Sequence, residues 1–185
     1  AEIEARFLQT YDCTPQRFAT AKSIADRQAP ILAAAQPMDC SVYAGIPFCP
    51  SRCSYCSFVS RTVGDKATRA QIEPYVACLC RELTATREVA DACGLSIKTF
   101  YIGGGTPTSL NAVQLRRLME HIRRTFPLET LQEYTVEAGR PDCTDEEKLR
   151  ILKEYGATRI SINPQTFSDE VLRNIGRKHS AQDIL

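Results

Sequence analysis

From residue 40 onward, strand-like and helix-like segments alternate regularly, and this alternation constrains the fold more than any other feature. Short apolar or β-branched stretches occur at residues 40–46, 97–102, 132–138 and 158–163, and segments with helical spacing separate them. Parallel strands need a long return connection, which a helix provides. The sequence therefore predicts an α/β fold with a mainly parallel sheet of about four strands, either barrel-like or doubly wound.

The ends of the helices are marked by capping residues. A long helix is expected over residues 67–94, with Gly94 as its stop, and another from about Asn111 to Thr125. In the latter helix, Val113, Leu118 and Ile122 are expected on one apolar face. These signals predict two helices that pack against the sheet.

Two shorter helices are expected nearer the C-terminus. Thr144 and Glu147 occupy capping-box positions of a helix that ends at Gly156. Ser168 is the expected N-cap of a shorter helix, and residues 177–185 read as the start of one more. The chain is therefore expected to stop within its fold.

Residues 1–38 differ from the rest of the chain. They are polar and rich in Ala, and we expect a mainly helical N-terminal segment that is broken at Pro15, Pro30 and Pro37. Residues 39–185 are expected to form the second part of the chain, which carries the chemistry.

Composition excludes several classes of protein. The 185 residues are 43% hydrophobic and carry a net charge of +1, with Lys and Arg interspersed among Asp and Glu. A soluble domain with a core is expected, and no nucleic acid partner is indicated. No apolar run reaches the length of a membrane span, and the first ten residues lack the apolar core of a secretory signal. We therefore expect a cytoplasmic protein.

Three of the nine cysteines lie within eight residues, in "CPSRCSYC" directly after the first predicted strand. Cys49, Cys53 and Cys56 follow a C-x3-C-x2-C spacing. An odd cysteine count with uneven spacing is not typical of a disulfide framework. In a reducing compartment, such clustered thiols indicate metal or redox chemistry.

Three interpretations of these thiols remain open at this point. Three cysteines on one loop can hold three corners of an iron–sulfur cubane and leave the fourth iron open to another ligand. Structural zinc is the metal alternative, although it normally takes four ligands, of which the fourth could come from Cys40, His121 or His179. Ordinary buried or disulfide-bonded cysteines are the third interpretation.

A run of glycines follows the second predicted strand. Residues 103–105 allow the backbone to approach a ligand closely and to offer free amide donors, or they form only a tight turn. The G-x-G-x-x-G spacing of dinucleotide-binding sites is missing. Glu137 ends the third strand, where a carboxylate can accept hydrogen bonds from ribose hydroxyls, and Gln165 follows the fourth. All these motifs are expected at one edge of the sheet, which argues for one site.

Four motifs in this order resemble the radical S-adenosylmethionine (SAM) superfamily, and within it the oxygen-independent coproporphyrinogen III oxidase-like family. They are "GIPFCPSRCSYCSF", "YIGGGTPTSL", "YTVEAGRPD" and "RISINPQTF". With "IGRKHS", they are most similar to the coproporphyrinogen dehydrogenase branch. The resemblance implies a partial (β/α) barrel, truncated here after about four strands, so that residues 39–185 would be the N-terminal part of a radical SAM core.

The same resemblance assigns the site residues. It implies that Cys49, Cys53 and Cys56 bind a [4Fe-4S] cluster whose open iron is chelated by SAM. No catalytic residue of the protein itself is carried over. The positions that match SAM contacts are Tyr43, Tyr55, Gly104, Gly105, Thr106, Glu137, Gln165 and Arg177.

The family's chemistry is one-electron reduction of the cluster, cleavage of SAM to a 5′-deoxyadenosyl radical, and abstraction of hydrogen from the substrate. The resemblance thus implies a radical SAM oxidoreductase of porphyrin and haem biosynthesis. It would convert coproporphyrinogen III, a tetrapyrrole, to protoporphyrinogen IX by oxidative decarboxylation of two propionates. A reducing electron donor such as flavodoxin or ferredoxin is implied as a partner.

Two departures from the family pattern are visible. Ser57 and Phe58 follow Cys56, whereas the well-known oxidases carry a further cysteine two positions after the third ligand, and haem chaperones of the same superfamily do not. A haem-binding chaperone is therefore the alternative function. The chain also supplies about four of the usual six β/α units, so we expect a fragment that lacks most of the substrate-binding region and is inactive alone.

Overall fold

The computed structural model describes residues 2–58 and 60–185. The chain divides into two compact units, residues 1–39 and residues 40–185. No helix among the described residues is long and apolar enough to cross a membrane.

The N-terminal unit is a pair of helices, α1 (Glu2–Thr10) and α2 (Pro15–Ala34). The Phe7 ring lies 5.8 Å from that of Tyr11 and 5.5 Å from that of Phe18, measured between ring centroids. The predicted break at Pro30 is wrong, because α2 continues through this proline to Ala34. Pro15 instead begins α2, where its missing N–H costs no hydrogen bond.

The second unit is built on a four-stranded sheet with the order β1-β4-β5-β6. Its strands are β1 (Asp39–Ile46), β4 (Ser96–Gly104), β5 (Glu133–Glu137) and β6 (Arg159–Ser161). β4 pairs with β5 and β5 with β6, both in parallel. The predicted parallel α/β sheet is confirmed, and its strands follow those expected from the sequence.

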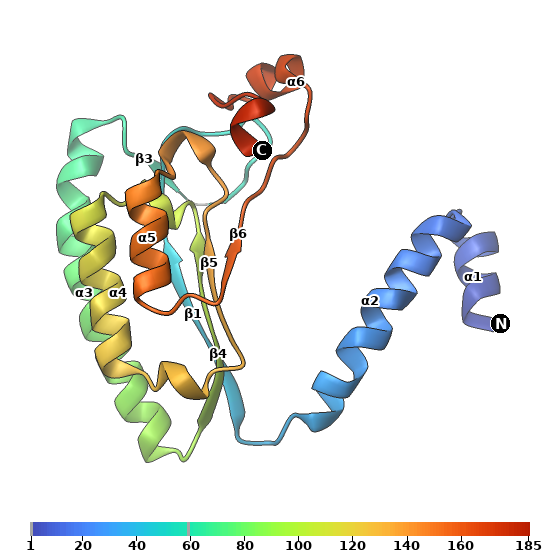
Figure 1. Ribbon diagram of the computed structural model, residues 1–185, viewed down its shortest axis with the longest axis horizontal. Helices are drawn as coiled ribbons and strands as arrows, with labels where there is room; N and C mark the ends of the chain where they lie inside the picture. Colours follow the sequence, from blue (N-terminus) through green and yellow to red (C-terminus); the bar gives the residue numbers. More distant parts are fainter. Residues whose placement is uncertain (1, 59) are drawn as a thin grey trace. The chain divides into compact units, whose positions relative to one another are not determined.

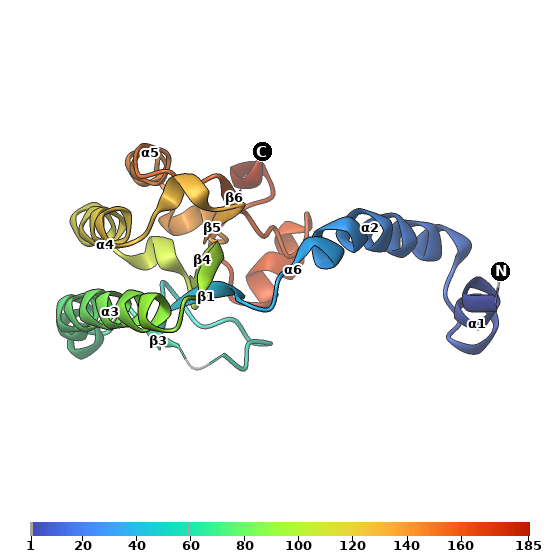
Figure 2. The same ribbon diagram turned by 90° about the horizontal axis from the view of Figure 1, so that it is seen from below.

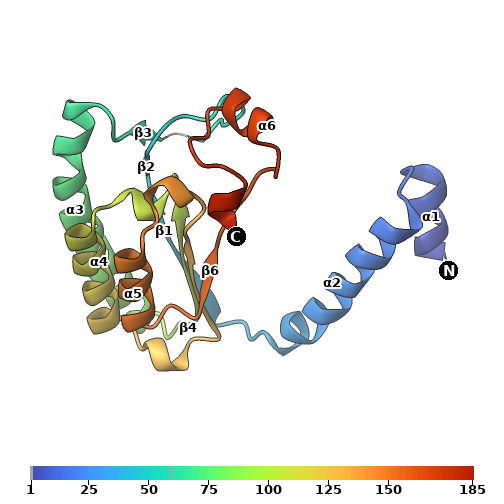
Figure 3. The same ribbon diagram turned by 45° about the horizontal axis from the view of Figure 1, so that its top comes forward.

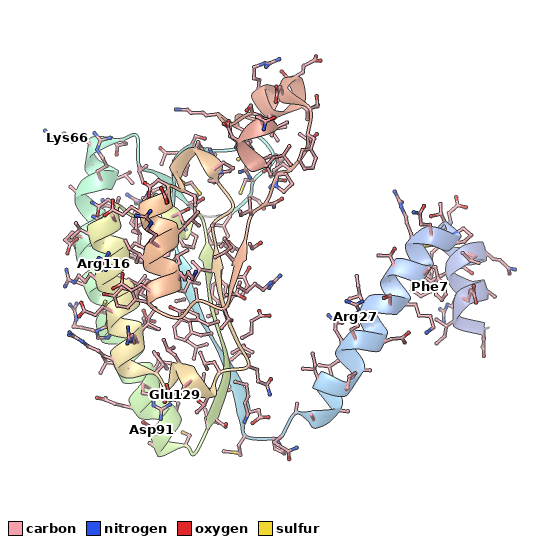
Figure 4. All side chains as sticks on the ribbon, viewed as in Figure 1. Phe7, Arg27, Lys66, Asp91, Arg116 and Glu129 are labelled. Atoms are coloured by element: carbon pink, nitrogen blue, oxygen red, sulfur yellow. The ribbon has the colours of Figure 1, made fainter. Side chains whose placement is uncertain are left out.

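Three helices connect the strands and cover the same face of the sheet, as Figures 1 and 2 show. They are α3 (Lys66–Ala92), α4 (Ala112–Thr125) and α5 (Glu146–Glu154). Lys66 and Asp91 mark the two ends of α3 in Figure 4. The side chains between these helices and the sheet form the core. Its largest fully buried members include Phe100, Ile102, Leu115, Leu118, Met119, Ile122, Tyr134, Ile151 and Leu152.

Shorter elements lie between and after the main ones. β2 (Phe48–Cys49) and β3 (Arg61–Thr62) form a small parallel pair, and α6 (Asp169–Asn174) follows β6. The one-turn helices are η1 (Pro107–Ser109), η2 (Leu128–Thr130), η3 (Pro141–Cys143) and η4 (Gln182–Ile184). The expected helix over residues 177–185 is therefore only the single turn of η4.

The glycine ends of α3 and α5 and the N-cap of α6 agree with the sequence, whereas the start of α5 does not. Gly94 and Gly156 follow α3 and α5 with φ of 66° and 91°, a left-handed conformation that favours glycine. Ser168 caps α6 as predicted, by accepting a hydrogen bond from the Val171 N–H. The predicted capping box at Thr144 is wrong, because Asp145 is the N-cap and accepts from the Lys148 N–H. The Thr144 hydroxyl donates instead to Thr108 Oγ1.

The apolar face of α4 was predicted only in part. Leu118 and Ile122 are fully buried, whereas Val113 is 78% exposed. Leu115 and Met119 complete the buried stripe. Val113 lies in the first turn on the opposite side of the helix, so a three-residue pattern was too short to fix the face.

We expect Leu118→Ala to lower the free energy of unfolding by about 2–5 kcal/mol, since it removes a fully buried side chain and leaves a cavity. Val113→Ala on the same helix should change it by less than about 0.5 kcal/mol, because Val113 faces solvent. Urea unfolding followed by circular dichroism measures both. Equal effects would contradict the burial pattern of α4.

Candidate functional site

The predicted motifs meet at one end of the sheet. Because the sheet strands are parallel, their C-terminal ends lie at one edge, and each is followed by one of the sequence motifs. β1 leads into the cysteine loop, β4 ends in the glycine run, and β5 ends at Glu137. Figure 3 shows β2, β3 and α6 gathered at this end.

A cavity of about 220 Å³ opens at this edge. All the predicted site residues except Tyr43 line it. The sequence analysis missed four further lining residues. Gly139 and Arg140 directly follow the third predicted strand, and Ser161 and Asn163 lie in the last part of the fourth. A larger cavity of about 430 Å³, lined by Pro141 and His179 among others, contains none of the three clustered cysteines. The thiols therefore make the smaller cavity the candidate site.

The three clustered cysteines differ in their surroundings. Cys49 and Cys53 are buried and Cys56 is half-buried. The Thr106 hydroxyl donates to Cys49 Sγ over 3.5 Å, and Arg140 Nη1 donates to Cys53 Sγ over 3.6 Å. All nine cysteines lie in the described residues and all are free thiols, so the disulfide interpretation is wrong for this structure.

The thiols share a cavity wall without converging on one point. Among residues 2–58 and 60–185, no three Cys, His, Asp or Glu side chains are arranged to hold a metal ion. None of the three residues expected to supply a fourth zinc ligand, Cys40, His121 and His179, lines this cavity. His121 Nε2 lies 3.0 Å from the Thr84 hydroxyl instead.

The glycine run packs against the strand that carries Cys49. A Cβ on Gly105 would lie 2.6 Å from Phe48 O and 3.0 Å from Cys49 Sγ, so only glycine fits there. The Gly105 and Thr106 amides donate to Ile46 O and Phe48 O, over 2.7 and 2.8 Å. For Gly105, the expectation of a free amide donor is therefore wrong, because its amide and that of Thr106 attach the glycine run to β1 and β2.

Glu137 is held by a tyrosine from the neighbouring strand. The Tyr101 hydroxyl donates to Glu137 Oε1 over 2.6 Å, and this bond, together with partial burial, raises the pKa of Tyr101 to about 12. The Tyr43 ring stacks on Tyr101 at 5.8 Å with an interplanar angle of 14°. Tyr43 is 60% exposed and does not line the cavity, so its contact with the site in the described structure is the stacking on Tyr101.

Arg177 contributes a buried guanidinium. Its Nη1 donates to Gly139 O and its Nη2 to the Tyr55 hydroxyl, each at a distance of 3.0 Å, while its Nε is buried and has no hydrogen-bond partner among the described residues. Burial raises the pKa of Tyr55 more than the bond from Arg177 lowers it. An unpaired buried N–H costs free energy unless a ligand accepts from it.

Gln165 adopts an unusual backbone conformation at the cavity. Its φ of 63° is in the left-handed region that few residues other than glycine adopt, and its N–H donates to Asn163 Oδ1 over 3.3 Å. Such strain is typical of functional sites, where surrounding contacts hold a side chain in a required direction.

The fold and the site define a parallel α/β protein with a thiol-lined cavity at the C-terminal edge of its sheet. The sequence matches the Radical SAM superfamily over residues 43–185. The chain belongs to this superfamily, as the resemblance in its motifs predicted. The superfamily uses a [4Fe-4S] cluster and SAM as cofactors.

Some relatives are named as coproporphyrinogen III oxidases or oxidase-like proteins, and others as heme chaperones. A Bacillus subtilis (strain 168) protein named oxygen-independent coproporphyrinogen-III oxidase-like protein HemZ is 36% identical, covering 100% of this chain and 37% of the relative. Heme chaperone HemW of the same organism is 41% identical, covering 78% of this chain and 36% of the relative. The solved structure of coproporphyrinogen III oxidase (HemN) from Escherichia coli, titled a radical SAM enzyme, matches with a TM-score of 0.67 and 26% identity, covering 94% of this chain and 36% of that chain. The chain thus spans little more than a third of the length of these relatives.

The residues at the cavity fit the superfamily's cofactors. Three thiols on one loop provide ligands of the type that iron–sulfur clusters take. The unpartnered Arg177 Nε suits an anionic group, such as the carboxylate of SAM, and Glu137 suits hydroxyl donors such as those of a ribose.

The Tyr101–Glu137 hydrogen bond predicts a specific dependence of stability on pH. Because the folded-state pKa of Tyr101 is raised from 10.0 to about 12, its contribution is complete below pH 10 and is lost as the pH rises through about 12. The difference in free energy of unfolding between wild type and Tyr101→Phe should therefore shrink between these pH values. Urea titrations across this range measure it, and a pH-independent difference would contradict the prediction.

Proposed function

We propose that Cys49, Cys53 and Cys56 are the protein ligands of a [4Fe-4S] cluster. The observation that carries this proposal is the single cavity that all three line together with the glycine run, Glu137 and Arg177. With three thiolates on four irons, one iron keeps a position for SAM.

The remaining site residues are proposed to orient SAM. Arg177 offers its unpartnered Nε to the carboxylate, and Glu137 accepts from the ribose hydroxyls. Tyr43 acts through Tyr101, which fixes the Glu137 side chain. The residues proposed to complete the SAM contacts by lining the cavity are Tyr55, Gly104, Gly105, Thr106 and Gln165.

The proposed reaction is oxygen-independent oxidative decarboxylation of coproporphyrinogen III to protoporphyrinogen IX, in a longer protein of which this chain is a fragment. This proposal is supported by the name of the Bacillus subtilis relative HemZ and by that of the matched Escherichia coli structure. When bound, the cluster and SAM supply a one-electron source and a carbon radical that removes hydrogen from the substrate. The chain's own residues bind and orient both groups.

We also propose a domain organisation, an electron donor and a cellular location for the protein. Residues 39–185 are the N-terminal part of a radical SAM core domain, and residues 1–38 are a mainly helical segment that precedes it. A donor such as flavodoxin or ferredoxin supplies the electron, and the location is cytoplasmic, without a nucleic acid partner.

A haem-binding chaperone is the second candidate function. Two observations favour it: Ser57 and Phe58 follow Cys56 in place of a further cysteine, and heme chaperone HemW of Bacillus subtilis is 41% identical over 145 residues. Both functions use the same cluster and SAM site, so they differ in the tetrapyrrole and in its fate.

We expect anaerobic reconstitution with iron and sulfide to give the brown absorption of a [4Fe-4S] cluster, and Cys53→Ser to lose most of it together with the bound iron. Cys93→Ser is the matched control, because Cys93 is exposed and lies outside the cavity. Absorption spectra and iron and sulfide analysis measure both. An unchanged iron content in Cys53→Ser would remove Cys53 as a ligand, and zinc without iron or sulfide in the wild type would overturn the cluster.

The two functions are separated by assaying the full-length protein anaerobically with SAM and a reductant. We expect cleavage of SAM that depends on coproporphyrinogen III, with loss of carbon dioxide and formation of protoporphyrinogen IX. Chromatography of the tetrapyrroles measures the product. Stoichiometric haem binding without turnover would favour the chaperone instead.

A further inference from the structure

Arg140 is a buried charged residue at the cavity that the proposed function leaves without a role. It follows β5, lines the cavity and is only 3% exposed. Its Nε and Nη2 donate to the two carboxylate oxygens of Asp142, each at a distance of 3.0 Å. This two-point ion pair fixes the plane of the guanidinium and leaves its Nη1 free to bond elsewhere.

The remaining donors of Arg140 reach the cysteine loop. Nη1 lies 3.4 Å from Ser51 O and 3.6 Å from Cys53 Sγ, and Nη2 donates to Ser51 Oγ over 2.8 Å. Ser51 Oγ in turn donates to Gly176 O over 3.2 Å. Hydrogen bonds to Asp142 and Ser51 therefore hold the guanidinium in place, with its Nη1 directed at Cys53 Sγ.

A structural role alone does not account for this arrangement. Burying a guanidinium is costly even when it is paired, and the same loop could be anchored by neutral hydrogen bonds such as that from Ser51 to Gly176. What a guanidinium adds is a permanent positive charge and an N–H directed at sulfur. Both change the relative free energies of two charge states of whatever the sulfur binds.

We propose that Arg140 sets the reduction potential of the cluster by acting on it through Cys53. This inference rests on the proposed function, because it requires that Cys53 is a cluster ligand. Arg140 is a positioning residue rather than a catalytic one, since it contacts the ligand sulfur and not the reacting atoms. Its ion-pair partner Asp142 is proposed to have the opposite effect on the reduction potential.

The signs of the two effects follow from the charges. Reduction adds one electron to the cluster and neither forms nor breaks a bond to Arg140. Positive charge and N–H donation to sulfur stabilise the more negative, reduced cluster, and so raise its potential. Asp142 counteracts this effect, because the negative charge of its carboxylate, held by two hydrogen bonds of 3.0 Å, offsets the positive charge of the guanidinium.

The test is a redox titration of the reconstituted chain with dithionite as the one-electron reductant, followed by electron paramagnetic resonance. Arg140→Gln should lower the potential, with the equilibrium constant for reduction falling about tenfold, which is about 59 mV for a one-electron couple. Asp142→Asn keeps the guanidinium but removes its counter-charge, so its potential should rise.

Lys148→Met is the matched control. Lys148 is also a buried cation near this edge, but its Nζ donates to the carbonyl oxygens of Thr108 and Cys143 rather than to a clustered thiol. Its loss should leave the potential unchanged. Iron content and thermal unfolding confirm that each variant is folded and loaded.

Opposite shifts in the Arg140 and Asp142 variants would support the proposal. An unchanged or higher potential in loaded Arg140→Gln would overturn it, as would an equal shift in Lys148→Met. If Arg140→Gln does not retain a cluster, Asp142→Asn decides, and an unchanged or lower potential there overturns the inference. Failure of the wild-type chain to bind iron and sulfide would overturn the proposed function itself, which is a separate result.

Discussion

Two backbone hydrogen bonds hold the halves of the candidate site together, and the rest of its geometry depends on them. The Gly105 and Thr106 amides donate to Ile46 O and Phe48 O. These bonds join the residues that follow β4 to the end of β1 and to β2, the strand that carries Cys49. This close approach is possible only because Gly105 has no Cβ to collide with Phe48 O. The Gly105 and Thr106 amides therefore bond to the protein's own backbone and are not free to donate to a ligand.

The overall fold could be predicted because hydrophobic spacing and strand chemistry agree over long stretches. β-Branched and aromatic residues mark the four strands, and the glycines after α3 and α5 adopt the left-handed conformation that ends a helix. The errors arose where one local signal competes with another. Thr144 has the right chemistry for an N-cap, but Asp145 is one residue closer to α5, and Pro30 is tolerated inside α2.

The position of the site could also be predicted, since parallel strands bring every motif at their C-terminal ends to one edge. What sequence alone does not contain is the direction of individual side chains. Tyr43 lies in β1 between buried residues, and its ring stacks on Tyr101 and does not line the cavity. Arg140 was missed because its importance comes from the distance to Cys53, which is 87 positions away in sequence.

The two buried arginines of the site illustrate how charge is divided within it. Arg140 has a carboxylate partner, Asp142, and its free edge faces a thiol. Arg177 forms no ion pair within the part of the chain that the structure describes, and its neighbours are a carbonyl oxygen and a hydroxyl. A buried guanidinium without a counter-charge is stabilised by any anion that reaches it. Arg177 therefore favours an anionic ligand at the end of the cavity near Gly139 and Tyr55. Because Asp142 already compensates Arg140, Arg177 is the guanidinium of the two that is left to pair with the proposed anionic ligand.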